Sequence, residues 1–436
     1  MSHDPALTSA SNSATGHTTV DAHGTMASDS MPALPLAGLT VLEFTHAVMG
    51  PCAGVILADL GAEVIHIEPP DGDPTRRLRG MGTGFFPYFN RNKRSLAVDL
   101  KHADGRALIE RLLHTADIIV ENFGPGTMDR LGFGYEALSD RWPQLIYCSL
   151  KGFLPGPYEQ RHAMDEVVQM MGGLAYMTGP PGTPLRAGTS VVDITGGMFG
   201  VMGVLTALYE RQRTGRGQLI RAALFETTAF LMGQHMAHGA LSRQPVPPMP
   251  ARISPWSVYR TFQPADGDPV FIGLVSDKHW QRFCHAFDRA DLATDASLQT
   301  NNARIEARDR LLPAIEQLIA SFPRAGVIAR CERADIPFAP IARPEDLFDD
   351  PQLNAGAGLL DTQLDADTRA RMPRTPLELD GRTLPLRSHP PAVGADTRDI
   401  ARRAGLDDPT IDALIHAGVL AAADVAAETS HPSDTP

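Results

Sequence analysis

The chain has 436 residues and a formal net charge of −12, an acid excess that argues against a nucleic-acid partner, because such binding needs a basic face. Its uncharged runs are broken by Gly and Pro, so no membrane span and no membrane partner are expected. The cysteines are far apart and the histidines are scattered, which argues against a disulfide framework or a metal site and favours a reducing, cytoplasmic location.

The N-terminal half alternates short apolar runs with amphipathic stretches. Residues 1–33 lack Lys and Arg and are rich in Ser and Thr, which predicts a disordered tail. Apolar runs predict strands at residues 39–44, 63–68, 95–100, 117–121, 145–150 and 218–224. Helical spacing predicts helices at residues 51–60, 107–113, 135–142, 194–213 and 225–241. This alternation predicts an α/β large domain over residues 34–242, with an open, doubly wound parallel sheet.

The pattern changes after a proline-rich linker at residues 243–257. Two strands and two helices are predicted next, at residues 258–262, 270–274, 278–287 and 302–321. Asp266-Gly267 between the two strands indicates a β-hairpin, so residues 258–340 are expected to form a smaller α+β domain. Residues 341–436, with a helix pair at 397–404 and 407–417, are expected to be a return linker and the C-terminal part of the large domain.

Several common site signatures are absent from the sequence. The first predicted strand–helix turn reads THAVMGP rather than G-x-G-x-x-G, so it does not predict a dinucleotide site of the usual kind. No Gly-Lys pair, H-E-x-x-H run or G-x-S-x-G run occurs, which excludes a P-loop and the commonest metalloprotease and hydrolase signatures.

Five long blocks carry the most informative sequence. They read LAGLTVLEFTHAVMGPCAGVILADLGAEVIHIEPPDGDPTR (36–76), NRNKRSLAVDLK (90–101), ADIIVENFGPGTMDRLGFGYEAL (116–138), RAGTSVVDITGGMFGVMGVLTALYERQRTGRGQ (186–218) and IPFAPIARPEDLFDDPQL (336–353). In these blocks, and in their order, the chain resembles the class III CoA-transferase family (CaiB/BaiF type), which includes formyl-CoA transferase, carnitine CoA-transferase and α-methylacyl-CoA racemase relatives. The resemblance extends from about residue 36 to residue 419.

The resemblance implies a fold and an activity. The fold is a large domain with a Rossmann-like open parallel sheet, made from both ends of the chain, and a smaller α+β domain between them. Two such chains would thread through each other as an interlocked homodimer. The activity is transfer of CoA from an acyl-CoA donor to a carboxylic acid acceptor, with coenzyme A and acyl-CoA as substrates and no permanently bound cofactor.

Asp193, in VVDITGG, aligns with the catalytic aspartate of this family. The resemblance implies that its carboxylate forms an aspartyl anhydride and then an aspartyl-CoA thioester. The residues alone also fit a helix N-cap, because Asp193 follows a predicted strand at 190–192 and precedes a helix. The two roles are compatible, since a helix start would keep the carboxylate ionised and let the N–H groups of Gly196 and Gly197 approach an oxyanion.

The segment before Asp165 helps to decide between two activities found in this family, CoA transfer and racemisation. The racemases of this family carry a histidine in a G-H-D run where this chain has Ala163-Met164-Asp165, and Met164 cannot exchange a proton. We therefore favour a transferase. An acyl-CoA racemase or isomerase that uses His162, and a non-catalytic CoA-binding protein, are the alternatives. Asp165 is expected to be a second carboxylate in the CoA site or the cap of a helix at 166–176.

Candidate CoA-binding residues come from two segments that match the family. By resemblance, Asn122 and Arg130 line the CoA site. The main chain of His46, Ala47 and Val48 corresponds to a turn beside the pantetheine. The glycine-rich loop of formyl-CoA transferase has no counterpart at residues 243–259, which argues against oxalate and formate and favours a dicarboxylate or branched acid.

A local excess of positive charge lies inside one of the matching stretches. Between residues 76 and 101 seven basic residues accompany a single acidic one, although the whole chain is acidic. Such a run is commonly a solvated face. Inside a stretch that matches a CoA-binding family, it makes Arg76 and Arg94 candidates for binding the CoA phosphates.

Overall fold

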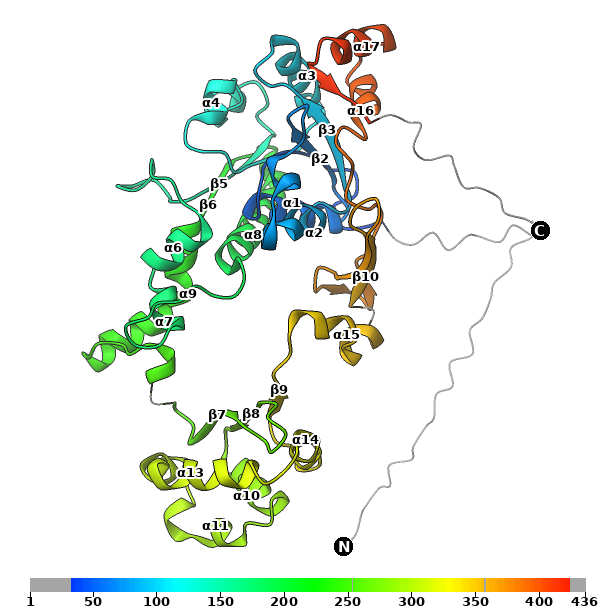
Figure 1. Cartoon of the computed structure of the whole chain (residues 1–436). Coiled ribbons are helices and arrows are strands. Elements are labelled where there is room, and N and C mark those ends of the chain that lie inside the picture. Colours follow the sequence, from blue (N-terminus) through cyan, green and yellow to red (C-terminus); the bar gives the residue numbers. More distant parts are fainter. Residues whose placement is uncertain (1–32, 253, 357, 424–436) are drawn as a thin grey trace, which may run out of the picture.

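The computed structural model describes residues 33–252, 254–356 and 358–423. Apart from residue 33, the tail predicted at residues 1–33 lies outside these residues. Figure 1 shows a large layered unit and a smaller unit at the opposite end of the molecule. Two separate chain passages join them, one leaving α9 (Leu224–Ser242) and one entering α15 (Pro351–Ala355).

The larger unit is built on a seven-stranded sheet in the order β14-β3-β2-β1-β4-β5-β6. Its strands are β1 (Thr40–Phe44), β2 (Glu63–Glu68), β3 (Lys93–Val98), β4 (Ile118–Glu121), β5 (Ile146–Lys151), β6 (Leu219–Ala223) and β14 (Leu420–Ala421). All neighbouring pairs are parallel except β14–β3. The α/β class with a parallel-dominated sheet is therefore confirmed, and the six predicted strands all occur.

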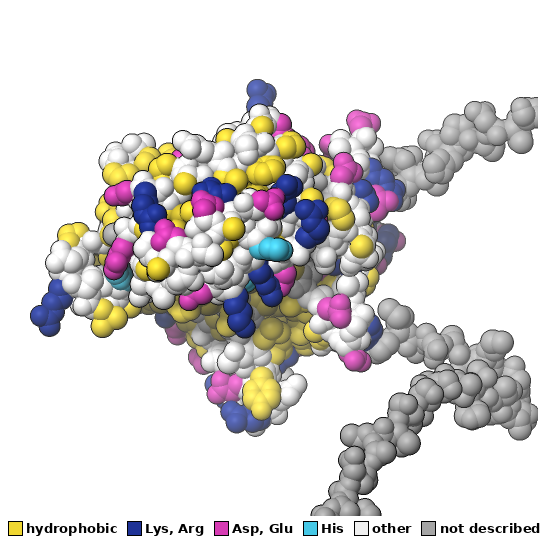
Figure 2. All heavy atoms as spheres, turned by 90° about the horizontal axis from the view of Figure 1, so that it is seen from below, with side chains coloured by type: hydrophobic (Ala, Val, Ile, Leu, Met, Phe, Trp, Pro, Cys, Tyr) yellow, Lys and Arg dark blue, Asp and Glu magenta, His cyan; other side chains and the backbone are white. Residues whose placement is uncertain are grey.

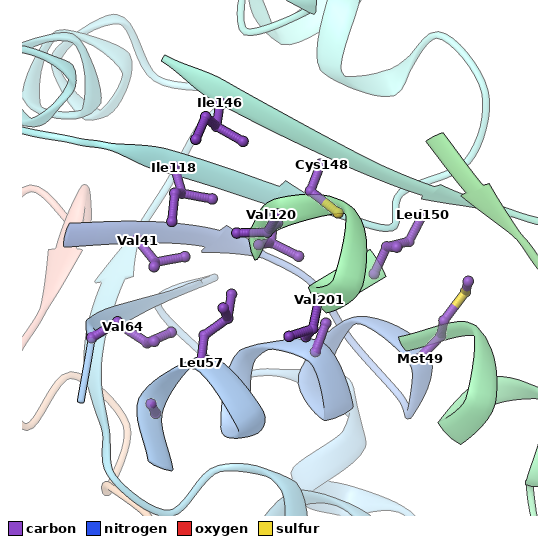
Figure 3. Close-up of a cluster of buried hydrophobic side chains, with 14 of the residues drawn as sticks. Val41, Met49, Leu57, Val64, Ile118, Val120, Ile146, Cys148, Leu150 and Val201 are labelled. Atoms are coloured by element: carbon purple, nitrogen blue, oxygen red, sulfur yellow. The ribbon is translucent and has the colours of Figure 1, made fainter. Parts of the chain in front are cut away.

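Helices cover both faces of this sheet. They are α1 (Met49–Asp59), α2 (Phe85–Phe89), α3 (Ala103–Leu113), α4 (Thr127–Leu131), α5 (Tyr135–Ser139), α6 (Asp165–Met171), α7 (Leu174–Thr178), α8 (Val191–Thr214), α9, α16 (Thr397–Arg403) and α17 (Asp408–His416). Alternate strand residues point to opposite faces. Val41 and Ile118 thus pack with Leu57 of α1 and Val201 of α8 in one core (Figure 3), whereas Leu42 belongs to the core beneath α3, α16 and α17.

Helix α8 lies against α1 with its backbone unusually near. A Cβ on Gly197 of α8 would lie 2.7 Å from the carbonyl oxygen of Met49 and 3.2 Å from the backbone nitrogen of Ala53 in α1. By length and composition, α8 is the one helix of the described residues that could span a membrane, and in this fold it packs against α1, β5 and β6. Because a Cβ at position 197 would overlap the backbone of α1, a glycine is required there for the two helices to lie this close.

Gly197→Ala is expected to lower the free energy of unfolding by about 1–3 kcal/mol, because backbone atoms of α1 cannot move aside as a flexible side chain can. Urea or thermal unfolding measures the change. Gly233→Ala in α9 is the matched control: nothing lies within 4 Å of its new Cβ, so alanine there is expected to stabilise by about 0.5–1 kcal/mol. Equal effects of the two substitutions would contradict the close contact.

The C-terminal segment returns to the larger unit. Strand β14 pairs with β3, and the Asp396 carboxylate accepts hydrogen bonds from Arg94 Nε and the Ser95 N–H, both at 3.0 Å. The Thr397 hydroxyl accepts the Ala97 N–H at 3.1 Å. Residues about 300 positions apart in the chain therefore complete one edge of the sheet.

The smaller unit has its own three-stranded sheet and core. Its elements are β7 (Val258–Phe262), β8 (Val270–Leu274), β9 (Phe338–Pro340), α10 (Asp277–Ala286), α11 (Ala290–Thr294), α12 (Asn301–Glu306), α13 (Arg308–Ile319) and α14 (Arg324–Arg333). The predicted hairpin is confirmed by the antiparallel pairing of β7 with β8. The single helix predicted at 302–321 is wrong: α12 ends at Glu306 and α13 begins at Arg308, because Ala307 between them leaves the helical conformation, with φ −85° and ψ 5°. Basic and acidic side chains lie side by side on the face at this end (Figure 2).

Short antiparallel hairpins follow α15. They are formed by β10 (Leu359–Gln363) with β11 (Arg369–Pro373) and by β12 (Glu378–Leu379) with β13 (Arg382–Thr383). The chain then runs back to the large sheet, where the Arg387 and Ser388 N–H groups donate to the Asn92 side chain at 2.6 and 2.9 Å. These bonds tie the returning segment to the turn before β3.

Candidate functional site

The order of the large sheet reverses between β1 and β4. From β1 the chain proceeds outward to β2 and β3 on one side, and from β4 to β5 and β6 on the other. At such a switch point the loops at the carboxyl ends of the two strands diverge and leave a crevice, which is the usual ligand site of open α/β sheets. The residues that follow β1 and β4 are His46 and Asn122, both candidates from the sequence.

Asn122 fixes the backbone of the turn after β1. Its Oδ1 accepts the His46 N–H at 3.0 Å, and its Nδ2 donates to the His46 carbonyl at 2.9 Å. Ala47 has a φ of 62°, and its N–H donates to the Thr75 hydroxyl at 3.0 Å. The Val48 side chain is buried beside Cys52 and Phe89. The structure thus brings His46, Ala47, Val48 and Asn122 together, and Asn122 supports the turn by its amide.

A buried ionic cluster lies beneath this turn. Lys93 Nζ contacts Glu43 Oε1 and Oε2 at 2.8 and 3.0 Å, and His66 Nδ1 lies 2.8 Å from Glu43 Oε2. His66 Nε2 faces Asp73 Oδ2 at 3.4 Å, and Asp73 Oδ1 accepts the Thr75 N–H at 2.7 Å. Burial alone would lower the pKa of His66, but the nearby carboxylates of Asp73 and Glu43 raise it to about 9. The cluster therefore links the sheet interior to the turn through Thr75.

Asp193 is the third residue of α8. The strand predicted at 190–192 is wrong, and Ser190, not Asp193, occupies the N-cap position, because Val191 and Val192 already have helical conformation. None of the hydrogen bonds within the described part of the chain ends on the Asp193 carboxylate. Next to it, Cys52 of α1 approaches the Ile194 carbonyl with its Sγ at 3.8 Å, so Asp193 lies beside the start of α1.

Asp165 caps the helix that carries Asp193. Its Oδ2 accepts the Val192 N–H at 2.9 Å and the Asp193 N–H at 3.2 Å. Its Oδ1 accepts a bond from Gln169 Nε2 at 2.5 Å. The prediction that Asp165 caps its own helix is wrong, and the helix predicted at 166–176 is two helices, α6 and α7, separated at Gly173, whose φ is 86°.

The surroundings of Asp193 favour its protonated form. Burial, followed by the negative charge of Asp165, raises its pKa to about 7, and the positive charge of Arg186 partly opposes this. The proposed oxyanion role of the Gly196 and Gly197 N–H groups is not supported. Both residues lie inside α8, where these groups donate to the preceding turn, and both face α1.

The basic run between residues 76 and 101 is largely neutralised within the chain. Arg76 donates to Glu68 from Nε and Nη2 at 2.8 and 2.7 Å. Arg94 donates to Glu63 at 2.8 Å and to Asp399 at 2.5 Å. Since Glu63 begins β2, this contact lies towards the amino edge of the sheet, opposite the crevice. The structure therefore does not bring Arg94 to Asn122 or Asp193.

Arg130 and Lys151 lie on the other side of the switch point. Arg130, on α4, is exposed and contacts the Thr127 hydroxyl at 2.8 Å. Lys151 ends β5 and donates to Glu121 Oε2 at 2.7 Å, beside a cleft of about 340 Å³ lined by α4, β5, β6 and residues 153–160. Lys151 is not among the residues that the sequence singles out. The signal for it is the pair of opposite charges, Glu121 and Lys151, at the ends of two adjacent parallel strands.

No group of three or more potential metal-ligating side chains occurs among residues 33–252, 254–356 and 358–423. The four cysteines are buried and unpaired. Cys52 lies nearest the site, and burial raises the pKa of its thiol to about 12.

Known proteins resemble the chain over most of its length. It is 33% identical over 376 residues to a succinate–glutarate CoA-transferase of Agrobacterium fabrum, covering 83% of this chain and 93% of that protein. It is 35% identical over 365 residues to an acetyl-CoA:oxalate CoA-transferase of Acetobacter aceti, covering 80% and 90%. A crystal structure of a CAIB/BAIF family protein from Brucella suis matches with a TM-score of 0.76 at 32% identity, covering 85% of this chain and all of that one.

The family assignment agrees with the resemblance found in the sequence. The model of the family named "CoA-transferase family III" matches residues 36–397, a span that includes the turn after β1, Asn122, Asp165 and Asp193. It ends within α16, where the chain has returned to the large sheet. The crevice at the switch point and the start of α8 both lie inside this match. The chain belongs to CoA-transferase family III.

Proposed function

We propose that the protein transfers CoA from an acyl-CoA to a carboxylic acid, with Asp193 as the nucleophile. The observation that carries this proposal is the Asp193 carboxylate, which has no hydrogen-bond partner within the described residues although Asp165 fixes its backbone. A carboxylate that is positioned and partly removed from water attacks more readily than one fully solvated. Its pKa of about 7 leaves an ionised fraction at neutral pH.

The reaction proceeds through two covalent forms of Asp193. A carboxylate oxygen attacks the thioester carbonyl, a C–O bond forms, and the C–S bond breaks to release CoA thiolate and leave a mixed anhydride. The thiolate then attacks the Asp193 carbonyl carbon, which gives an aspartyl-CoA thioester and releases the donor acid. The acceptor carboxylate repeats both steps in reverse and regenerates the free carboxylate. Each intermediate keeps an activated acyl bond, so no other energy source is required.

We place the pantetheine along the turn of His46, Ala47 and Val48, whose backbone conformation is held by Asn122 and Thr75. Arg130 keeps an exposed guanidinium near the switch point, so it is a better candidate for the CoA phosphates than Arg76 or Arg94. The latter two already donate to carboxylates of this chain. Arg76 and Arg94 are therefore assigned to structure in this proposal.

The transferase is favoured over a racemase because of the segment before α6. Met164 occupies the N-cap position of α6 with 71% of its surface exposed, and its thioether carries no exchangeable proton. His162 is exposed two residues earlier, outside any helix or strand. At the position where the racemases of this family carry a histidine, the chain therefore offers no side chain that could exchange a proton, which favours transfer over racemisation.

A homodimer is part of the proposal. Met198, Met202, Leu205 and Tyr209 follow one another along α8 at helical spacing, and each keeps 39% or more of its surface exposed. Such a stripe is typical of a protein interface. We expect a second copy to cover it, in the interlocked arrangement that the resemblance implies, and the four buried thiols fit the reducing cytoplasm.

The test is capture of the covalent intermediate. The protein is mixed with acetyl-CoA, succinyl-CoA or butyryl-CoA, quenched with borohydride and digested for mass spectrometry. An aspartyl thioester is expected to be reduced to the corresponding alcohol at Asp193, and intact mass before quenching is expected to show a CoA-sized adduct. CoA without an acyl group is the control. Absence of an adduct with all three thioesters would contradict the proposal.

A further inference from the structure

Arg186 is a half-exposed cation next to the proposed nucleophile. It lies just before α8, and 38% of its side chain is exposed. The Asp165 carboxylate joins the two residues: its Oδ2 accepts the Asp193 N–H at 3.2 Å, and its Oδ1 lies 3.5 Å from Arg186 Nη2. The Asp165 carboxylate therefore lies between Arg186 and the backbone of Asp193 and contacts both.

The position of Arg186 is fixed by its backbone. The neighbouring Ala187 N–H donates to Gln169 Oε1 at 2.8 Å, and Gln169 is fully buried and also donates to Asp165. One buried amide thus holds both the segment with Arg186 and the carboxylate that caps α8. The backbone that carries Arg186 is therefore held beside the carboxylate that caps the start of α8.

The guanidinium itself is only loosely paired. Its Nε donates to the Ala187 carbonyl at 3.2 Å, whereas Nη2 and Nη1 lie 3.5 and 3.8 Å from Asp165 and Glu166. Charge-assisted N–H···O bonds normally measure about 2.7–2.9 Å, so the two outer nitrogens retain unused donors. A planar fork of free N–H groups matches the two oxygens of a carboxylate.

The geometry points to Arg186 as a specificity-determining residue that binds the distal carboxylate of a dicarboxylic acid while its reacting carboxylate, or thioester, meets Asp193. This inference rests on the proposed function, because it assigns the second end of the same substrate. A monocarboxylic acid of equal length would meet Asp193 equally well but leave the fork unused. Arg186 therefore acts on the choice of acid rather than on the bond-forming steps.

Matched acids separate this role from a structural one. With acetyl-CoA and butyryl-CoA as donors, kcat/KM is measured for succinate against butyrate and for glutarate against valerate. The wild-type protein is expected to prefer the dicarboxylate of each pair. Arg186→Gln is expected to lower kcat/KM for the dicarboxylates by about 10- to 100-fold and to change the monocarboxylates less than about threefold. Arg186→Lys keeps the charge but not the two parallel N–H donors. Its kcat/KM for the dicarboxylates is expected to lie between those of the wild type and Arg186→Gln.

Arg141→Gln is the control, because Arg141, in the turn after α5, is also half-exposed and lies 3.4 Å from its carboxylate partner, Glu110 of α3. Equal losses for both acids of a pair would show that Arg186 only positions α8, and would overturn the inference. So would an unchanged preference in Arg186→Gln, or no preference in the wild type. Absence of transfer to any of the four acids would instead overturn the proposed function, and the inference with it.

Discussion

Asp193→Ala is expected to lower the rate of CoA transfer by at least about 10⁴-fold, because alanine cannot form either covalent intermediate. The substitution removes a carboxylate that has no hydrogen-bond partner within the described residues, so the capped start of α8 should stay in place. Initial rates with a donor thioester and an acid measure the loss. A decrease of less than tenfold would contradict nucleophilic catalysis by Asp193, and unchanged CD spectra would show that the variant is folded.

Asp193→Asn adds a second readout from the same position. Because the folded-state pKa is raised from 3.8 to about 7, the unfolded chain ionises first as pH rises, and the wild type loses stability between about pH 4 and pH 7. The Asn variant avoids this loss, so its advantage should be absent below pH 4 and reach on the order of 4 kcal/mol above pH 7. Asp291→Asn is the opposite control, since Arg289 lowers the pKa of Asp291 to about 2 and its loss should not stabilise.

Lys93→Met is expected to lower the free energy of unfolding by about 3–5 kcal/mol, because it leaves a buried carboxylate without one of its two cationic partners. Lys93 and Glu43 are both fully buried, and Lys93 Nζ and His66 Nδ1 each lie 2.8 Å from a Glu43 carboxylate oxygen. Without it, Glu43 has only His66 to balance its charge. Urea unfolding at pH 7 measures the change.

Two further variants show whether the unbalanced charge is the cause. Lys93→Met combined with Glu43→Gln should recover part of the lost stability, because no buried anion is then left uncompensated. Lys101→Met, at an exposed position beyond the same strand, should change stability by less than about 0.5 kcal/mol. If the double variant is as unstable as the sum of the two single changes, lost packing rather than charge is responsible.

The strands of the large sheet could be predicted because each has a recognisable pattern of residues in its own local sequence. Runs such as VLEF and EVIHIE are apolar, β-branched and bounded by turn residues, so periodicity alone located β1 and β2. The start of α8 was missed for the same reason: Val191 and Val192 favour a strand by type. The Val191 N–H donates to the Thr189 carbonyl, and the Val192 N–H donates to Asp165, which is 27 residues away from Val192. A cap supplied from another helix leaves no local pattern.

The candidate site was located by resemblance more than by chemistry. Asn122 and the turn after β1 are brought together by the sheet order, which local sequence does not encode. Residues 76–101 contain many basic residues and one acidic residue, so the sequence predicts an unbalanced positive patch there. In the fold, Arg94 pairs with Asp396 and Asp399, about 300 residues away in the chain. A charge count along the chain cannot detect partners that only the returning C-terminal segment supplies.

That returning segment also sets the order in which the protein can form. The outer edge of β3 is paired by β14, only a few residues before the end of the described chain, and α16 and α17 cover one of its cores. During synthesis, the first half of the polypeptide therefore emerges with an open sheet edge and exposed apolar side chains, while the smaller unit, contiguous in sequence, can fold as soon as it leaves the ribosome. We expect ribosome-bound chains that stop before residue 394 to depend on chaperones, because the edge of β3 stays unpaired until β14 has been made.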